Sequence, residues 1–355
     1  MRGAIIGDIV GSRFEFDSDF KSKDFDLFHD DCKFTDDTTM TCAVADWIMS
    51  GDDLSALPKQ MLSRYIEHGR HRSYGVMFEQ WLTSWDQKPY CSFGNGAAMR
   101  ISPIMLAHTG QIDKTFRTVE NITAVSHSHQ EGIRGAVAVA GCMLLAHHGA
   151  PTQTLREFAR RCGYTLDKNV DEIRKDYSFD ESCQGTVPQA ITCAIEAADF
   201  EDAIRNAVSI GGDSDTVAAI TGSIAEQLFK LPEEGELWTK AKEYLPPSIL
   251  KAVKEYDSYS FEVGFAYSRP EQGPTEIDEI LNWVDSWRHS LWRYPDGMGT
   301  NPGEPRNEEE VPEKNWLSLQ AEKARRSGAY QGLKERRDRP PDLTAWNEIM
   351  KGEED

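Results

Sequence analysis

Two short runs of this sequence place carboxylates and threonines together at the start of an apolar helical pattern. The first run is FTDDTT and the second is GGDSDT. Their oxygen-bearing residues are Thr35, Asp36, Asp37, Asp213, Asp215 and Thr216. Carboxylate and hydroxyl oxygens are the ligands that Mg²⁺ and Mn²⁺ prefer. The same residues also suit an ordinary helix N-terminus, where threonine caps the chain and acids complement the helix dipole.

Each run alone favours a simple helix cap, but the two together favour a metal site. If the fold brings them together, four aspartates lie close to one another and repel unless cations neutralise them. Two divalent ions would balance that charge. The adjacent Asp36 and Asp37 would then point toward different ions, or toward an ion and its water. The pattern therefore predicts a binuclear metal site, whereas His29 with Cys32 lacks the second ligand pair of a zinc site.

Glycine recurs in two segments where a backbone or a ligand could approach closely. Gly3, Gly7 and Gly11 are four positions apart, so in a helix they form one face without side chains. A dinucleotide-binding turn is the alternative, but the spacing lacks the G-x-G-x-x-G pattern. The run SFGNGAAMR, residues 92–100, is either a turn before a helix or a loop that offers free N–H groups to phosphate oxygens.

The acidic composition disfavours several classes of function. The 355 residues carry a formal net charge of −20, which would repel a nucleic-acid backbone. The first apolar run stops at Asp8, too early for a secretory signal, and no apolar stretch is long enough to span a membrane. The seven cysteines form no C-x-x-C pair and are expected to be reduced. We expect a soluble, cytoplasmic protein that binds neither membranes nor nucleic acids in general.

The elements that must position these residues are predicted to be helices. Apolar residues recur at helical spacing through most of the chain, so we expect an all-α fold. One alternating stretch, residues 259–267, predicts a short strand instead. The composition changes near the run SRPEQGP. We therefore divide the chain into a catalytic domain, residues 1–265, and a C-terminal helical extension, residues 266–355.

The extension holds five of the nine tryptophans, which is more aromatic surface than a solvated tail would carry. We predict that Trp283 and Trp287 are buried, against the core or a second subunit, on a helix that begins near Thr275. Further helices are predicted from residue 312 to 326 and after residue 341. The extension could pack on the core, join two copies of the chain as a homo-oligomer, or border the cleft and select the substrate.

Five motifs occur in an order that resembles the ADP-ribosylglycohydrolase family, which includes the dinitrogenase reductase-activating glycohydrolases and the ADP-ribosylhydrolases. The motifs are GDIVGSRFE, FTDDTT, SFGNGAAMR, SHSH and GGDSDT, and the resemblance covers roughly residues 1–260. It implies a compact orthogonal bundle of helices with two Mg²⁺ or Mn²⁺ ions in a cleft. It also implies hydrolysis of the bond between ADP-ribose and its acceptor, with ADP-ribose as a product.

The resemblance assigns roles to particular residues. The metal ligands of the family fall on the six residues of the two acidic runs named above. Its substrate-binding residues fall on Ser92, Gly94, Asn95, Gly96, Met99 and His127. Glu15 matches a glutamate that is placed near the reacting ribose. We expect Glu15, or else Asp36 or Asp37, to handle the proton that glycosidic hydrolysis must move.

Two other classes of function fit parts of the pattern. The run DSDTV, residues 213–217, matches the D-x-D-x-[TV] motif of haloacid-dehalogenase-like phosphatases, which requires a buried strand before it. A catalytically inactive protein that binds ADP-ribose or metal on the same fold is the second alternative.

The sequence does not decide which acceptor is released from ADP-ribose. The candidates are arginine, serine, another side chain, and a small-molecule or nucleotide conjugate. The acidic stretch of residues 15–31 would favour a cationic leaving group such as guanidinium, or is a solvated loop.

Overall fold

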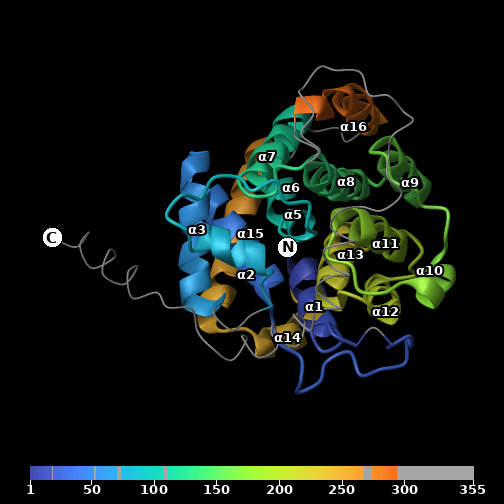
Figure 1. Cartoon of the computed structure of the whole chain (residues 1–355). Helices are drawn as coiled ribbons and strands as arrows, with labels where there is room; N and C mark the ends of the chain where they lie inside the picture. Colours follow the sequence, from blue (N-terminus) through green and yellow to red (C-terminus); the bar gives the residue numbers. More distant parts are fainter. Residues whose placement is uncertain (18, 52, 70–72, 108–110, 268–273, 294–355) are drawn as a thin grey trace, which may run out of the picture.

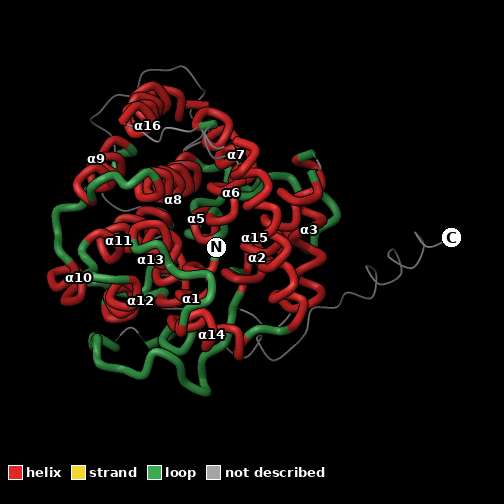
Figure 2. Tube along the Cα trace, turned by 180° about the vertical axis from the view of Figure 1, so that it is seen from behind, coloured by secondary structure: helices red, strands yellow, loops and turns green. Residues whose placement is uncertain are grey.

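The computed structural model of the chain describes residues 1–17, 19–51, 53–69, 73–107, 111–267 and 274–293. Within these ranges the chain is helical and contains no β-strand, so the predicted all-α fold is confirmed. Figures 1 and 2 show the helices packed around α1 and α13, which lie side by side in both views. The α-helices are α1 (Arg2–Gly11), α2 (Asp36–Ser50), α3 (Leu57–Arg64), α4 (Val76–Leu82), α5 (Gly96–Met99), α6 (Ser102–Ala107), α7 (Ile112–Ala124), α8 (Gln130–His147), α9 (Thr152–Arg161), α10 (Val170–Asp176), α11 (Cys183–Ile195), α12 (Phe200–Ser209), α13 (Ser214–Leu228), α14 (Glu236–Ala241), α15 (Pro247–Tyr267) and α16 (Pro274–Trp287).

The glycine face of α1 packs directly against the backbone of α13. A Cβ added at Gly7 would lie 2.0 Å from the carbonyl oxygen of Ala218, and one at Gly11 would lie 2.3 Å from that of Ser214. Only hydrogen in place of a side chain allows the backbones of α1 and α13 to come this near. The predicted glycine face is therefore confirmed, and the dinucleotide-binding alternative is wrong because these glycines lie within a helix.

Both acidic runs stand at helix N-termini. Thr35 is the N-cap of α2, and its hydroxyl accepts a hydrogen bond of 3.3 Å from the backbone N–H of Asp37. Before α13, Gly211 and Gly212 take positive φ angles of 73° and 84°, which glycine tolerates without strain. These two glycines turn the chain from the end of α12 into α13, so that Asp213 occupies the N-cap position.

The predicted strand at residues 259–267 is wrong, because these residues form the last part of α15. The alternation of aromatic residues there has the period of a strand, but no neighbouring strand exists in the described residues to pair with it. Helix α15 as a whole packs on α2 and α6.

The start of the extension packs on the core through α16. Trp287 is 4% exposed, and its indole N–H donates a hydrogen bond of 2.9 Å to Glu120 of α7. Trp283 is half-buried and stacks on Phe116 with ring centroids 3.9 Å apart. The predicted burial is therefore confirmed for Trp287 and partial for Trp283. The helices predicted from residue 312 to 326 and after residue 341 lie outside the described residues.

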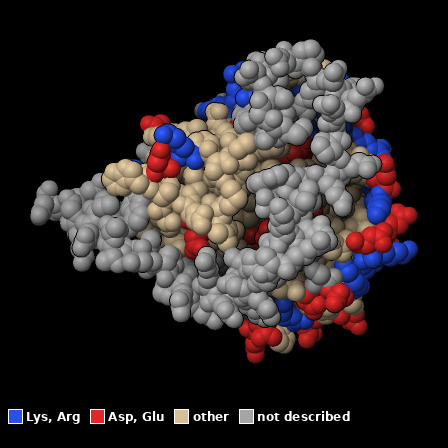
Figure 3. All heavy atoms as spheres, in the orientation of Figure 1, with Lys and Arg blue, Asp and Glu red and all other residues tan. Residues whose placement is uncertain are grey.

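The structure also describes the state of the cysteines, the apolar character of the helices and part of the surface. All seven cysteines are free thiols, as predicted. No helix among the described residues combines the length and the apolar character that a membrane crossing needs. Figure 3 shows acidic and basic side chains interspersed along the right and lower edge of the face in view, and an area of uncharged residues to the left of its centre.

Candidate active site

The fold brings the two acidic runs together into one buried cluster. The hydroxyl of Thr216, in the first turn of α13, donates a hydrogen bond of 3.1 Å to Oδ2 of Asp37, in the first turn of α2. The four aspartates of the cluster are each at most 8% exposed. They are Asp36, Asp37, Asp213 and Asp215. The structure thus joins all six residues that the two motifs supply.

Asp8 of α1 holds the first turn of α2 in place. It is fully buried and accepts hydrogen bonds from the backbone N–H groups of Thr35, at 2.9 Å, and of Thr38, at 3.0 Å. It also accepts bonds from the hydroxyls of both threonines. Sequence reasoning missed this role. The signal was present, since a single aspartate inside an otherwise apolar helix needs polar partners when it is buried.

Burial and mutual repulsion make the acids of the cluster hard to ionise. Burial is the main cause that raises the pKa of Asp36, Asp37 and Asp213, and the charge of Asp215 is the second. The same two causes raise the pKa of Asp8 to about 6. Such a cluster is stable at neutral pH only with protons or with cations among its oxygens.

The donor set fits a hard divalent cation. Oδ1 of Asp37 is buried and has no hydrogen-bond partner, which is costly for a carboxylate oxygen unless a cation binds it. The surrounding groups are carboxylates and threonine hydroxyls, the oxygen donors that Mg²⁺ and Mn²⁺ prefer. In the described residues, no group of three or more His, Cys, Asp and Glu side chains is already arranged to hold a metal ion. Threonine and asparagine donors occupy several of the carboxylate oxygens instead.

Glu15 lies beside the cluster and is itself 4% exposed. Its Oε2 accepts a hydrogen bond of 2.7 Å from the hydroxyl of Ser73. Burial and, second, the charge of Asp215 raise the pKa of Glu15 to about 9. The glutamate is therefore protonated at neutral pH in the absence of a neutralising cation. The sequence did not identify Ser73 as a partner of Glu15, because no motif around Ser73 indicates this contact.

Asn95 connects the SFGNG loop, residues 92–96, directly to the acidic cluster. Its side-chain amide donates to Oδ2 of Asp213 at 2.6 Å and to the hydroxyl of Thr186 at 3.0 Å. Its backbone N–H donates to the carbonyl of Glu181 at 2.7 Å. At the start of the loop, the hydroxyl of Ser92 accepts a bond of 3.2 Å from the N–H of Gly94. Asn95 therefore positions a cluster aspartate, a contact that the sequence alone did not reveal.

His127 packs against the SFGNG loop. Its Nε2 lies 3.3 Å from the place that a Cβ at Gly96 would occupy and 3.6 Å from that at Gly94. Met99 is buried in the same region, and its carbonyl accepts a hydrogen bond of 3.5 Å from Thr41 of α2. The predicted substrate-binding residues thus lie next to one another, with Met99 inside the core below the loop.

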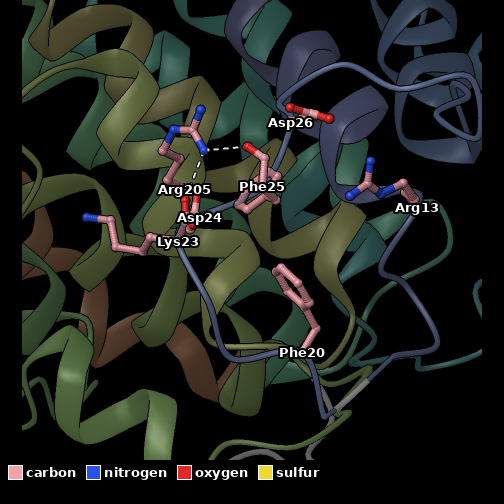
Figure 4. A pocket seen from close by; sticks show the side chains of 7 residues that line it. All are labelled: Arg13, Phe20, Lys23, Asp24, Phe25, Asp26 and Arg205. Carbon is pink, nitrogen blue, oxygen red and sulfur yellow. Dashed lines mark hydrogen bonds between the residues drawn. The ribbon is translucent and has the colours of Figure 1, made fainter.

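A cavity of about 800 Å³ lies beside the segment that leads from α1 to α2, away from the acidic cluster. Its lining residues, drawn in Figure 4, are Arg13, Phe20, Lys23, Asp24, Phe25, Asp26 and Arg205. The guanidinium of Arg205 donates to the carbonyls of Lys23 and Phe25, at 2.9 and 2.8 Å, as the dashed lines show. Lys21 donates a bond of 2.7 Å to the carbonyl of Tyr177. The acidic stretch is therefore fastened to the helical core.

Comparisons with known proteins show which proteins this chain resembles. The family model for ADP-ribosylglycohydrolase matches residues 1–226. An uncharacterised protein of Archaeoglobus fulgidus is 29% identical over 45% of this chain, a match that spans 58% of that protein's length. The ADP-ribosylarginine hydrolase Tri1 of Serratia proteamaculans is 26% identical over 64% of this chain and 69% of its own. The ADP-ribosylhydrolase ARH3 of Danio rerio is 24% identical over 72% of this chain and 89% of its own.

A solved structure shares the fold. A chain described as an ADP-ribosylglycohydrolase-related protein complex superimposes with a TM-score of 0.54. It is 21% identical in sequence, and the match covers 74% of this chain and 94% of that chain. At this identity the likeness concerns the arrangement of helices.

Proposed function

This chain belongs to the ADP-ribosylglycohydrolase family, and from that premise we propose that it hydrolyses the glycosidic bond between ADP-ribose and an acceptor with the help of two Mg²⁺ or Mn²⁺ ions. The observation that carries the proposal is the joined cluster of buried aspartates, in which Thr216 bonds to Asp37 and one oxygen of Asp37 has no partner. Capping two helices does not require four buried aspartates in one cluster, and burying acids without cations destabilises the fold.

The ions would be held by the six residues of the two motifs, Thr35, Asp36, Asp37, Asp213, Asp215 and Thr216. When bound, divalent ions supply a template for ribose hydroxyls and lower the pKa of a bound water. Asn95 keeps Asp213 in position through its bond to Oδ2. Asp8 does the same for the start of α2, where Thr35 and both aspartates of the first motif stand.

Glu15 is the residue proposed to handle the proton of the reaction. The bond from Ser73 occupies Oε2, which leaves Oε1 for the substrate. In the cation-free protein, burial and the charge of Asp215 raise the pKa of Glu15 and favour its protonated form. A departing acceptor needs a proton as the bond to C1 of ribose breaks, and Glu15 is the acid beside the cluster that is proposed to supply it. Asp36 is the second candidate, since a carboxylate that binds an ion through one oxygen can hold water through the other.

The acceptor that suits this site best is arginine. Phe16, next to Glu15, is 57% exposed and stacks with Phe179 at a centroid distance of 6.2 Å. Phe179 precedes two acids, Asp180 and Glu181, in the loop that bonds to Asn95. Aromatic faces beside carboxylates favour a planar guanidinium, because it stacks and carries a positive charge. The relative Tri1 is named for hydrolysis of ADP-ribosylarginine, which supports the same choice over a serine, nucleotide or other small-molecule conjugate.

The phosphatase alternative receives no support. Its D-x-D motif requires a preceding buried strand, whereas Asp213 follows helix α12 through a glycine turn and the described residues contain no strand. We keep residues 1–265 as the catalytic domain and residues 266–355 as the extension, with a role in oligomer contacts or substrate selection.

A panel of ADP-ribose linked to arginine, to serine and to a nucleotide would test the proposal, with released ADP-ribose as the readout. We expect hydrolysis in Mg²⁺ or Mn²⁺, fastest for the arginine conjugate, and loss of activity with a chelator. Glu15→Gln should keep ADP-ribose binding and lower turnover by ~10²–10⁴. Asp215→Ala should reduce both metal occupancy and turnover.

Asp46→Asn is the matched control, because Asp46 pairs with Arg64 at 2.6 Å and lies outside the cluster. It should leave turnover unchanged. Undiminished turnover in Glu15→Gln would remove that residue from the mechanism. Binding of ADP-ribose without release from any conjugate would instead identify a non-catalytic binding protein on the same fold.

A further inference from the structure

Arg100 is the largest side chain that is completely enclosed in the described part of the protein. It follows α5 at the end of the SFGNGAAMR run and is 0% exposed. Among the described residues no carboxylate pairs with its guanidinium, and its Nε and Nη1 have no hydrogen-bond partner. Burying a charge without a counter-charge costs free energy of folding. We therefore expect Arg100 to have a role other than stabilising the fold.

The partners of Arg100 point to His127. Nη2 of Arg100 donates a hydrogen bond of 2.8 Å to the hydroxyl of Ser126 and lies 3.4 Å from Nδ1 of His127. The same Ser126 hydroxyl lies 2.8 Å from Nδ1. Since a guanidinium only donates, the serine oxygen accepts from Arg100 and its O–H is free to donate to the histidine. Nδ1 is therefore the accepting nitrogen of the ring.

The other ring nitrogen must then carry the proton. Burial and, second, the charge of Arg100 lower the pKa of His127 well below its ordinary value, so the ring is neutral. A neutral imidazole that accepts at Nδ1 has its N–H at Nε2. Nε2 makes no hydrogen bond to any described residue and is not fully sealed from solvent. It lies against the SFGNG loop, 3.3 Å from the Cβ position of Gly96.

We infer that Arg100, acting with Ser126, is a positioning residue that holds neutral His127 in the tautomer whose Nε2–H faces the SFGNG loop and the ligand bound there. The ligand part of this inference rests on the proposed function, together with the expectation from the sequence that the SFGNG loop binds phosphate oxygens, here those of ADP-ribose. A fixed N–H donor binds an anionic oxygen more tightly than a ring that must first change tautomer.

Nitrogen NMR of the histidine side chains in the full, ligand-free chain tests the tautomer without any substrate. The His127 signals are assigned by their loss in His127→Gln. We expect a protonated Nε2 and an unprotonated Nδ1 in the wild type. Arg100→Met and Ser126→Ala should each introduce the Nδ1–H form. Ser126→Ala removes a single oxygen, so it keeps the test valid if Arg100→Met fails to fold.

Arg64→Met is the matched control, because Arg64 is also mostly buried but pairs with Asp46 away from His127. It should leave the His127 signals unchanged. Calorimetry with ADP-ribose provides the second readout, and Ser126→Ala should bind roughly tenfold more weakly, the value of one charge-assisted hydrogen bond.

Three results would contradict the positioning role of Arg100 and Ser126, its link to the ligand, or the proposed function. A wild-type His127 protonated at Nδ1, or an unchanged tautomer in Ser126→Ala, overturns the positioning role. A changed tautomer with unchanged ADP-ribose affinity overturns the link to the ligand. A wild-type protein that shows the expected tautomer but binds no ADP-ribose contradicts the proposed function and leaves the positioning role standing.

Discussion

Thr216 donates a hydrogen bond of 3.1 Å to Asp37, although 179 positions of sequence separate the two residues. This bond joins the first turns of α13 and α2, and so makes one cluster of two acidic motifs. It occupies Oδ2 of Asp37, whereas Oδ1 of the same carboxylate is buried and has no partner. The arrangement holds the aspartates in place and leaves an oxygen for a cation.

Replacing Thr216 by valine should weaken metal binding more than it weakens the fold. Valine keeps the shape, but Asp37 loses a buried donor, which should lower the free energy of unfolding by about 1–3 kcal/mol. Metal affinity, measured by calorimetry, should fall by roughly 10–100-fold. Thr221→Val is the control, because Thr221 is also buried in α13. Its hydroxyl donates a hydrogen bond of 3.0 Å to the carbonyl of Ala190, away from the acids. It should lose similar stability and keep its metal affinity.

The substitution Asp36→Asn distinguishes two roles for Asp36, that of a residue that stabilises the helix start and that of a metal ligand. Asparagine is well tolerated at a helix N-terminus, so a residue that only complements the dipole should lose at most about 1 kcal/mol of stability. If Asp36 binds an ion, the substitution removes a charge from the cluster and should abolish most of the hydrolysis. Thermal unfolding and ADP-ribose release would be measured on the same preparation. Full hydrolytic activity in Asp36→Asn would show that Asp36 stabilises the start of α2 and does not bind a metal ion.

Alanine at Gly7 should destabilise the protein more than alanine at an open glycine. The added Cβ would lie 2.0 Å from the carbonyl oxygen of Ala218, so α1 and α13 would have to separate. Overpacking of this kind costs about 1–3 kcal/mol or more, visible in urea unfolding. Gly75→Ala is the control, since no atom lies within 4 Å of its Cβ position and its φ is −59°. Equal stability of the two variants would contradict the close contact.

The metal-free protein should lose stability as the pH rises. Folding raises the pKa of Asp8 from 3.8 to about 6 and that of Glu15 from 4.5 to about 9. Because the folded values lie above the unfolded ones, their contribution is complete below about pH 4 and is lost as the pH rises through 6 and then 9. Protons also compete with cations, so Mg²⁺ affinity should rise over the same range.

Melting temperatures across this pH range, with a chelator and then with Mg²⁺, check both statements. Mg²⁺ should reduce the decline, whereas K⁺ at equal ionic strength should not. A chelated protein whose stability rises steadily from pH 5 to 8 would show that other groups dominate the acidic cluster.

Trp287→Ala should destabilise the helical core although the residue lies beyond the catalytic domain boundary at residue 265. Its ring is buried and its N–H bonds to Glu120, so the substitution leaves a cavity and removes this hydrogen bond. A loss of about 3–5 kcal/mol is expected from thermal unfolding. Trp85→Ala is the control, because Trp85 is 82% exposed, and it should change stability little. Similar values for both would mean that α16 is not anchored to α7.

The sequence by itself determined where the two acidic helices start, and it predicts the metal chemistry of those starts. Thr35 with two acids, and two glycines before Asp213, specify a cap and a turn through contacts within a few residues. The glycine spacing of α1 likewise predicted a close contact, since a helix places every fourth residue on one face. Local rules failed at residues 259–267, where the alternating pattern of a strand lies within helix α15.

Only the tertiary structure decided which groups face the cluster. The bond of Ser73 to Glu15, the contacts of Asp8 with α2 and the amide of Asn95 on Asp213 all join distant parts of the chain. The same holds for the raised pKa values and for the enclosure of Arg100. Burial and Coulomb repulsion depend on distances between elements, and those distances exist only after the helices have packed.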